Sequence, residues 1–316
     1  MSPGADRDAG AEVSEQQFRA LHQRLREANG SGTDDRRGAL NHLSRARVLA
    51  AIGEVRTGRT VSLAAPVETW VSPDNPEPAR HEMTEPTQAP AGAGASGLRF
   101  ALDRIAMNVH GNADSHIDAL SHVIYDDTLY NDVPADALTG AAALSIDVDH
   151  DGIVGRGVLL DIPRARGVRW LEPGDHVTAG DLAAAERAQN MAVEEGDLLF
   201  VRVGHRARRI ACGSWNAAEH RVGLHPTALE FLSDRRVAVL GGDGNNDTAP
   251  STTEGVDFPV HALAVHAMGL QLLDYLQFEE LRPICAERGR WSFLAVIAPL
   301  RLPDGTGSPV NPIAIL

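Results

Sequence analysis

Residues 196–204, Gly-Asp-Leu-Leu-Phe-Val-Arg-Val-Gly, contain the apolar run that does most to identify the fold of this chain. Short apolar runs of this kind are typical of strands that are buried on both faces of a parallel sheet. Residues 157–162, Gly-Val-Leu-Leu-Asp-Ile, form an earlier run of the same type. Between the two runs, residues 178–193 are predicted to form a capped helix. A strand, a helix and a strand in this order predict a parallel strand pair and an α/β fold.

The same alternation continues on both sides of this unit. Toward the C-terminus we predict a helix over 226–233, a strand over 236–240 that ends in the glycine-rich turn 241–244, a helix over 259–275 and a strand over 291–298. Near the N-terminus we predict a helix from Ser14, which begins an S-x-x-Q capping box, and a second helix over 44–55. Nothing indicates a second core, so we expect one domain over 14–316.

Two segments do not fit the alternation. Residues 1–13 are polar and acidic, and we expect them to be disordered. Residues 72–97 are rich in Pro, Gly, Ala and Glu, a composition that does not favour a packed element. We therefore expect a long excursion or a lid at 72–97.

The chain contains no lysine, so all 29 of its cationic side chains are arginines. P-loop NTPases and protein kinases place a lysine on the nucleotide phosphates, and Schiff-base enzymes need a lysine amine. These classes are therefore excluded. The net charge of −14, from 43 acidic and 29 basic residues, argues against nucleic acid or an anionic membrane as a partner. We expect a small-molecule substrate.

The expected compartment is the cytoplasm. No apolar run approaches the roughly 20 residues that span a bilayer, and the N-terminus lacks the pattern of a signal peptide. The two cysteines, Cys212 and Cys285, have neither metal-site nor redox spacing, so we expect both to be reduced and buried.

Three common motifs are imitated or absent. Asp147–Gly152 resembles the start of a calcium loop, but the twelfth position is Val158 where a bidentate Glu is needed. The turn 241–247 ends in Asp247 where a dinucleotide fingerprint has its last glycine. No G-x-S-x-G sequence is present, which argues against an ordinary serine hydrolase.

The stretch 109–122, Val-His-Gly-Asn-Ala-Asp-Ser-His-Ile-Asp-Ala-Leu-Ser-His, carries the strongest functional signal. His116 and Asp118 are two residues apart, a spacing that places both side chains on one face of an extended segment. Imidazole and carboxylate together are good ligands for Zn²⁺ or Mn²⁺. His122 follows four residues later, and an unligated histidine beside such an ion can move protons near neutral pH. The alternative is a polar surface loop, which does not explain the density of these residues.

This stretch resembles the motif H-x-G-T-H-x-D-x-P-x-H of the metal-dependent cyclase family, which includes bacterial kynurenine formamidase and isatin hydrolase. Four further segments match the family in order, so the resemblance covers roughly residues 31 to 316. They are the early G-x-L-N segment at 38–41, the strand at 196–204, the late histidine helix from His261 to Leu276, and the closing segment 305–312.

The resemblance implies hydrolysis of a cyclic or acyclic amide or a lactone at one or two divalent ions. It implies a three-layer β/β/α fold of the swivelling type with a mixed sheet, and a homodimer or homotetramer. Carried over to this chain, His116 and Asp118 are metal ligands and His122 is the general acid/base. The ion lowers the pKa of a bound water and polarises the scissile carbonyl.

The chain also departs from the family pattern. The family's first histidine lies four residues before its second, and Asn112 occupies that position, so either Asn112 or His110 is the third ligand. We favour His110 because imidazole binds these ions better than an amide oxygen. Leu120 replaces the family's proline. The late helix carries a His and a Glu in the family, and here these match His261 and the shorter Asp274, which puts a second ion in doubt.

Three residues are candidates for substrate contact: Arg202 in the family-like strand, His225 before Pro226, and Tyr125 just after the motif. For His261 and His266, packing in the core on one helix face is an equal alternative to a role in the site.

We therefore expect a divalent-metal hydrolase that opens a cyclic amide, a lactone or a formamide, with His122, His261 and Asp274 as catalytic residues and His110, His116 and Asp118 as ligands. Two alternatives stay open. One is a metal-dependent cyclase or dehydratase of secondary metabolism. The other is a metal-free binding protein, which Asn112 and Asp274 motivate.

Overall fold

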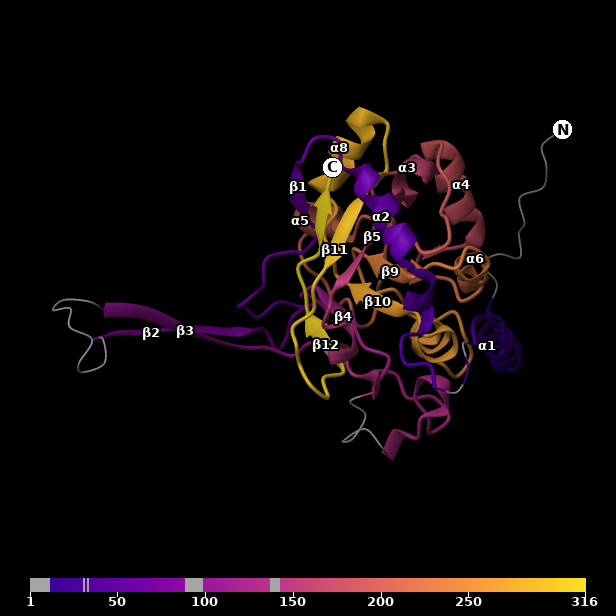
Figure 1. The fold of residues 1–316 in the computed structure, drawn as a ribbon, viewed down its shortest axis with the longest axis horizontal. Coiled ribbons are helices and arrows are strands. Elements are labelled where there is room, and N and C mark those ends of the chain that lie inside the picture. The colour runs from indigo at the N-terminus through magenta and orange to yellow at the C-terminus, as the bar shows by residue number, and fades with distance from the viewer. Residues whose placement is uncertain (1–11, 31, 33, 89–98, 137–142) are drawn as a thin grey trace.

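The computed structural model describes residues 12–30, 32, 34–88, 99–136 and 143–316, and it confirms the α/β fold (Figure 1). Its main element is one mixed sheet with the strand order β1-β13-β11-β5-β7-β9-β10-β4-β12. In chain order these strands are β1 (Thr60–Ser62), β4 (His116–Asp118), β5 (Ile153–Asp161), β7 (Leu198–Arg202), β9 (Val239–Gly242), β10 (Gln271–Asp274), β11 (Ser292–Ile297), β12 (Gly307–Pro309) and β13 (Ile313–Ile315).

The middle of the sheet is the parallel unit that the sequence predicts. Strand β5 pairs in parallel with β7, β7 with β9, and β9 with β10. The predicted crossover between β5 and β7 contains the helices α3 (Ile162–Arg166) and α4 (Ala179–Gln189). Helix α4 has the capping box at Thr178, and it ends where Asn190 adopts a left-handed conformation with φ of 49°.

The remaining helices and two strand pairs complete the described fold. The other helices are α1 (Glu15–Asn29), α2 (Arg45–Ala51), α5 (His205–Cys212), α6 (Ala228–Asp234), α7 (Pro259–His261), α8 (Leu281–Arg288), the 3₁₀ turns η1 (Gly38–His42), η2 (Ile52–Glu54), η3 (Tyr130–Asp132) and η5 (Ile146–Asp149), and the π-helix η6 (Ala262–Ala267). Two further strand pairs are β2 (Arg80–Gln88) with β3 (Arg99–Ala106), and β6 (His176–Val177) with β8 (Gly223–Leu224).

The sheet separates two hydrophobic cores. On one face, alternate residues such as Leu160 and Val201 pack under α1, α4, α6 and the π-helix. On the other face, Leu159 and Phe200 pack against the outer strands of the same sheet, which curls round, and against α8. Figure 1 shows α1, α4 and α6 together on one side. The single curled sheet thus supplies both β layers, and the helices supply the third layer.

The helix predicted over 259–275 is wrong in its second half. The helical segment ends with the π-helix at Ala267, and Gly269 turns the chain with φ of +63°. Gln271–Asp274 then form strand β10, which pairs with β9. A short apolar run fits a buried helix and a buried strand equally well, so the periodicity alone cannot separate them. Asp274 therefore lies on a strand.

Two predictions about exposure are also wrong. Val13, which we expected to be disordered, is buried and forms a β-bridge with Thr253, while residues 1–11 lie outside the described residues. Cys285 is buried as expected, but Cys212 is exposed because it ends α5 at the surface. Among the described residues, no helix is both long and apolar enough to cross a bilayer.

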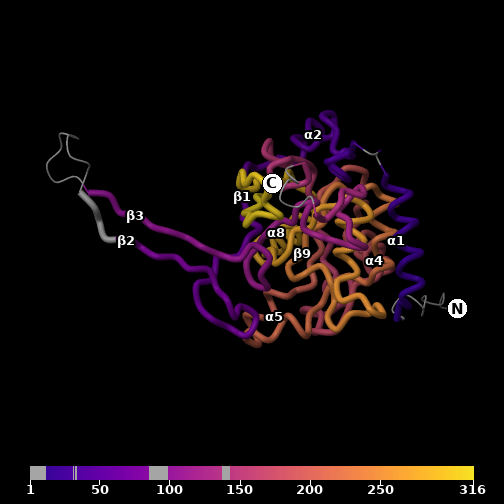
Figure 2. Tube along the Cα trace, turned by 90° about the horizontal axis from the view of Figure 1, so that it is seen from below, coloured from indigo at the N-terminus to yellow at the C-terminus, as the bar shows by residue number. Residues whose placement is uncertain are grey.

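The excursion predicted at 72–97 is a ribbon arm. Strands β2 and β3 pair antiparallel, from Arg80 opposite Ala106 outward to Gln88 opposite Arg99. Both views show this ribbon extending away from the body of the molecule (Figures 1 and 2). Residues 89–98 lie outside the described part of the chain. The arm does not lie over the body as a lid would.

We expect Gly38→Ala to destabilise the protein by roughly 2 to 3 kcal/mol. Gly38 has φ of +53°, and a Cβ there would overlap the carbonyl oxygen of Gly269. The two segments meet at this point, since the Ala39 amide donates to the Gly269 oxygen at 2.9 Å. Chemical denaturation measures the change, and Gly53→Ala is the matched control because its Cβ meets open space. Equal stability of the two variants would contradict the prediction.

We also expect the free energy of unfolding to fall as the pH is lowered from 6.5 to about 4. His266 and His22 are buried and share a 3.0 Å hydrogen bond between α1 and the π-helix. Burial lowers the pKa of His266 from 6.5 to about 4, so the unfolded chain binds more protons in this window. Denaturation of His266→Gln across this range should give a shallower slope than the wild type. An unchanged slope would rule out His266 as a source of the dependence.

Candidate metal centre

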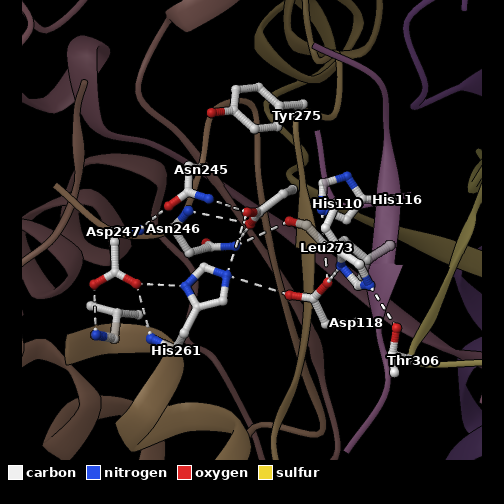
Figure 3. A network of polar contacts seen from close by, with 12 residues as sticks. His110, His116, Asp118, Asn245, Asn246, Asp247, His261, Leu273, Tyr275 and Thr306 are labelled. Carbon is white, nitrogen blue, oxygen red and sulfur yellow. Dashed lines mark hydrogen bonds and ion pairs between the residues drawn. The ribbon is translucent and has the colours of Figure 1, made fainter. Parts of the chain in front are cut away.

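Strand β4 brings the motif residues to the edge of the parallel unit. His116 and Asp118 alternate along β4 and share one face, as the spacing predicts. Strand β10 runs antiparallel to β4, and Asp274 is directly opposite His116. His261, from α7, completes the group (Figure 3). The antiparallel pairing of β4 with β10 therefore places Asp274 at the motif although the two are far apart in the sequence.

Asp118 lies at the middle of the group and is completely buried. Its Oδ1 is 2.9 Å from His110 Nδ1 and 3.7 Å from His116 Nε2. Its Oδ2 makes no hydrogen bond within the described residues, and the nearest cationic atom is His261 Nε2 at 3.4 Å. Burial alone would raise the pKa of Asp118, but the contacts with His110 and His261 hold it well below the usual value. The carboxylate is therefore an anion.

Backbone and side-chain partners orient the two motif histidines next to Asp118. His116 Nδ1 lies 2.9 Å from the Asp114 carbonyl oxygen, so it donates there and leaves the Nε2 lone pair facing Asp118. His110 Nε2 lies 3.1 Å from Thr306 Oγ1, at the start of the closing segment. Hydrogen bonds of this kind are typical of histidines that bind metals, because they set the tautomer and the ring orientation.

His122 packs face to face on His110, with ring centroids 3.6 Å apart and the ring planes at 7°. Burial lowers the pKa of His122 from 6.5 to about 4. The imidazole is therefore neutral at pH 7, and a neutral imidazole can accept a proton.

His261 is held by a carboxylate that the sequence analysis did not identify. Asp247 Oδ2 lies 2.5 Å from His261 Nδ1, and the same side chain accepts the backbone N–H groups of Val260 and His261. Burial alone would lower the pKa of His261, but Asp118, Asp247 and Asp274 together raise it well above 6.5. The hydrogen bond to Asp247 thus fixes the orientation of the His261 ring, so that its other nitrogen, Nε2, faces Asp118 and Asp274.

Two asparagines beside Asp247 hold Asp274 in turn. Asn245 Nδ2 donates to Asp274 Oδ2, and Asn246 Nδ2 donates to Oδ1, each at 2.5 Å (Figure 3). The sequence signal for these residues is the polar run 243–247 directly after a buried strand, which is no dinucleotide fingerprint but stands at a position that suits a site. Such turns at the carboxyl end of a parallel strand commonly line a site.

The residues fit a divalent ion. One ligand atom from each of His110, Asp118 and His122 lies within 4.8 Å of the others. The buried Asp118 Oδ2 lacks a hydrogen-bond donor, and a buried carboxylate oxygen in that state is stabilised by a cation. The geometry brings His110 to Asp118, whereas Asn112 Oδ1 accepts a hydrogen bond from the Tyr275 hydroxyl at 3.0 Å. His110, His116 and His122 all remain available as ligands around Asp118.

A cavity of about 520 Å³ opens over this group. Polar atoms of His110, His116, His122, His261 and Asp274 face it from one side. Apolar and aromatic side chains also line the cavity, together with the polar Asn112, Asn245 and Asp257. They are Val123, Ile124, Tyr125, Val256, Phe258 and Ala262. Tyr125, a candidate for substrate contact, therefore lines this cavity.

The other candidates do not reach this cavity. Arg202 is buried in an ion-pair network with Asp161 and Glu279. His225 is buried, and its Nδ1 lies 2.7 Å from Thr227 Oγ1. Of the two histidines that could either pack in the core or serve the site, His266 packs against α1 and His261 lines the cavity.

We predict that purified protein carries a divalent ion and that Asp118→Asn loses it. The amide removes the negative charge and replaces it with a poorer ligand of nearly the same shape. Elemental analysis of both proteins measures the difference. Asp149→Asn is the control, because Asp149 is a buried carboxylate that accepts from Gln271 away from the cavity. Retention of metal by Asp118→Asn would refute the assignment.

Comparison with known proteins identifies the family of this chain. A family model described as "Putative cyclase" matches residues 60–246. A solved structure described as a novel cyclase is 32% identical, covers 93% of this chain and 99% of its own, and has a TM-score of 0.79. No curated protein matches.

Two more distant structures share the fold. Isatin hydrolase A from Labrenzia aggregata, bound to benzyl benzoate, is 23% identical over 86% of this chain and 98% of its own, with a TM-score of 0.56. A predicted metal-dependent hydrolase from Bacillus stearothermophilus is 18% identical over 81% and 97%, with a TM-score of 0.50. The family model spans more than half of the chain, and the 32% identical structure covers nearly all of it. The resemblance seen in the sequence is thus confirmed, and the chain belongs to the Putative cyclase family.

Proposed function

We propose that this protein is a divalent-metal-dependent hydrolase that opens a cyclic amide, a lactone or a formamide. The observation that carries the proposal is the buried Asp118 carboxylate, which lies among histidines below a cavity and has one oxygen without a hydrogen bond. The names of two fold relatives, isatin hydrolase and metal-dependent hydrolase, support the same chemistry.

His110, His116 and Asp118 would hold the ion. An ion bound there acts as a Lewis acid on the scissile carbonyl and makes water a better nucleophile. Imidazole and carboxylate ligands suit both Zn²⁺ and Mn²⁺. The hydrogen bonds of His116 and His110 to Asp114 and Thr306 keep their rings directed at Asp118 before substrate arrives.

His122 is the proposed general base. Its neutral ring lines the cavity beside His110, so it can take a proton from the attacking water. The same nitrogen then returns the proton to the leaving nitrogen or oxygen. Stacking on His110 restricts the ring to one plane, which limits the loss of entropy on reaching the reactive geometry.

His261 and Asp274 line the same cavity. Asp247 accepts from His261 Nδ1 and directs Nε2 toward Asp118 and Asp274, at 3.4 and 3.6 Å. We propose that His261 holds a proton at Nε2 and that Asp274, gripped by Asn245 and Asn246, keeps this ring in position. The His261 N–H then stabilises negative charge that develops on the substrate in the cavity.

The remaining walls suit an apolar ring. Tyr125, Ile124 and Phe258 line the cavity, and the last two are half exposed in the free protein. A planar or aromatic cyclic amide or lactone would cover these surfaces, whereas a small aliphatic formamide would leave them in water. We therefore place ring substrates first.

The second candidate is a metal-dependent cyclase or dehydratase that uses the same residues to close a ring. It is favoured by one observation, the description of the 32% identical structure as a novel cyclase. The two reactions differ in whether water becomes part of the product.

The deciding experiment measures metal content and then screens isatin-like rings, cyclic imides, lactones and formamides in ¹⁸O-labelled water. Hydrolysis incorporates the label into a new carboxylate, and ring closure does not. A protein with less than about a tenth of an equivalent of Zn or Mn, and no gain on adding metal, would leave the metal-free binding protein as the explanation.

We predict that His122→Ala loses activity by at least about a hundredfold while the metal stays bound, since general-base catalysis contributes that much. Steady-state kinetics and elemental analysis of the same sample measure both quantities. Tyr130→Phe is a control, since its hydroxyl bonds Asp35 outside the cavity. If His122→Ala loses the metal, His122 is a metal ligand rather than the general base. If His122→Ala keeps the catalytic rate of the wild type, His122 has no role in the mechanism.

A further inference from the structure

Tyr275 directly follows Asp274 and has an unusual backbone conformation. Its φ is 54°, in the left-handed region that bulky side chains rarely adopt. Strained residues of this kind cluster at functional sites, where the surrounding contacts hold them. Here the Tyr275 amide donates to the Gly244 carbonyl oxygen at 2.9 Å, and the Tyr275 carbonyl oxygen accepts from Ser115 Oγ at 2.7 Å. These contacts fix Tyr275 beside the metal centre, with its ring centroid 6.4 Å from that of His116 (Figure 3).

The hydroxyl of Tyr275 contacts the side chain of Asn112. Tyr275 is completely buried, and burial raises the pKa of its hydroxyl above the usual value, so the hydroxyl keeps its proton. A buried donor without an acceptor costs free energy, so this proton needs a partner. Within the described residues its acceptor is Asn112 Oδ1, at 3.0 Å. Tyr275 is therefore the donor in this hydrogen bond.

This hydrogen bond decides which end of the Asn112 amide is left over. The reverse orientation would place Nδ2 against the hydroxyl oxygen and leave the hydroxyl proton without an acceptor. Asn112 is half-buried and lines the cavity over the metal centre. With Oδ1 bound to Tyr275, the two N–H groups of Nδ2 have no acceptor among the described residues. They are therefore free to donate to a molecule in the cavity.

The charges around the cavity decide which kind of oxygen fits this donor. Asp257 and Asp274 line the cavity, and its described lining residues include no arginine. His261, whose pKa is raised by its acidic neighbours, already pairs with Asp247 at 2.5 Å. A substrate carboxylate would thus meet two acidic side chains without a side-chain cation to pair with, and like charges repel. An uncharged carbonyl oxygen suits the Asn112 donor.

We propose that Asn112 donates a hydrogen bond from Nδ2 to a second, uncharged carbonyl oxygen of a ring substrate, in addition to the carbonyl that is attacked. Asn112 is then a specificity-determining residue, and Tyr275 is the positioning residue that orients its amide. The inference rests on the proposed function in one respect, namely that a ring substrate occupies this cavity. It gives Asn112 a role other than that of a metal ligand.

Two rings of nearly the same shape test the proposal. Phthalimide has two carbonyl groups, and isoindolinone has a methylene in place of one of them. Each ring is measured by kcat/KM if the metal-loaded protein opens it, and by its dissociation constant if it does not. For each ring, the variant is compared with the wild type in the same quantity. We expect Asn112→Ala to weaken phthalimide by about three- to tenfold, the contribution of one neutral hydrogen bond, and isoindolinone by less than about twofold.

Two further variants accompany this measurement. Asn112→Asp keeps an acceptor for Tyr275 but removes both N–H groups, so it should weaken phthalimide at least as much as Asn112→Ala. Asn108→Ala is the matched control, because the Asn108 amide bonds Glu77 at 3.0 Å and does not line this cavity. It should leave both rings unchanged. Equal losses for the two rings in Asn112→Ala would overturn the proposal. Loss of the metal from this variant would do the same, since Asn112 would then be a ligand.

Tyr275→Phe tests the positioning role. Without the hydroxyl the Asn112 amide can turn either way, so phthalimide should weaken by about two- to threefold while isoindolinone does not change. In the Asn112→Ala background the same substitution should have no further effect on phthalimide. Tyr130→Phe is the control, since its hydroxyl bonds Asp35 outside the cavity. If Tyr275→Phe keeps the wild-type value for phthalimide, Tyr275 does not orient the amide and the proposal fails.

Failure of this proposal is distinguishable from failure of the proposed function. If both rings bind and neither is opened, the hydrolase proposal fails for these rings, while the comparison of the two dissociation constants still decides the role of Asn112. If phthalimide neither binds to the metal-loaded wild type nor reacts with it, the role of Asn112 is refuted, whatever other substrates the protein opens.

Discussion

A carboxylate removed from water must be stabilised from several directions, and Asp118 obtains this from His110 and His116 of its own motif and from His261 of α7. The pairing of β4 with β10 makes this possible, because it sets His116 and Asp274 side by side. The ion that the site suits would satisfy the one oxygen that has no donor. Most other hydrogen bonds of the site orient the side chains that surround Asp118.

The irregular backbone serves that purpose. The chain leaves α7 as a π-helix and turns at Gly269, which lets β10 enter the sheet beside β9. The turn after β9 supplies Asp247 to His261 and two asparagines to Asp274. The close approach of Gly38 to Gly269 braces the same turn from the N-terminal side. Insertions into a helix of this kind are frequent at functional sites.

The arm and the site share a covalent link. Strand β3 ends at Ala106, and the chain continues through Asn108, which borders a cavity at the arm, to His110 in the metal centre.

Local patterns in the sequence determined the strands at 157–162 and 196–204, the helix that follows Thr178, and the grouping of His116 with Asp118, because each depends on residues a few positions apart. The order of the motifs along the sequence also indicated the family. Tertiary structure decided what depends on distant segments. Leu272 and Leu273 form a strand because they pair with β9. His261 lies in the site, whereas His266 packs on α1. Arg202 forms ion pairs with Asp161 and Glu279. These contacts join residues that are far apart in the sequence and come together only when the sheet curls. The spacing of residues within one segment therefore cannot predict them.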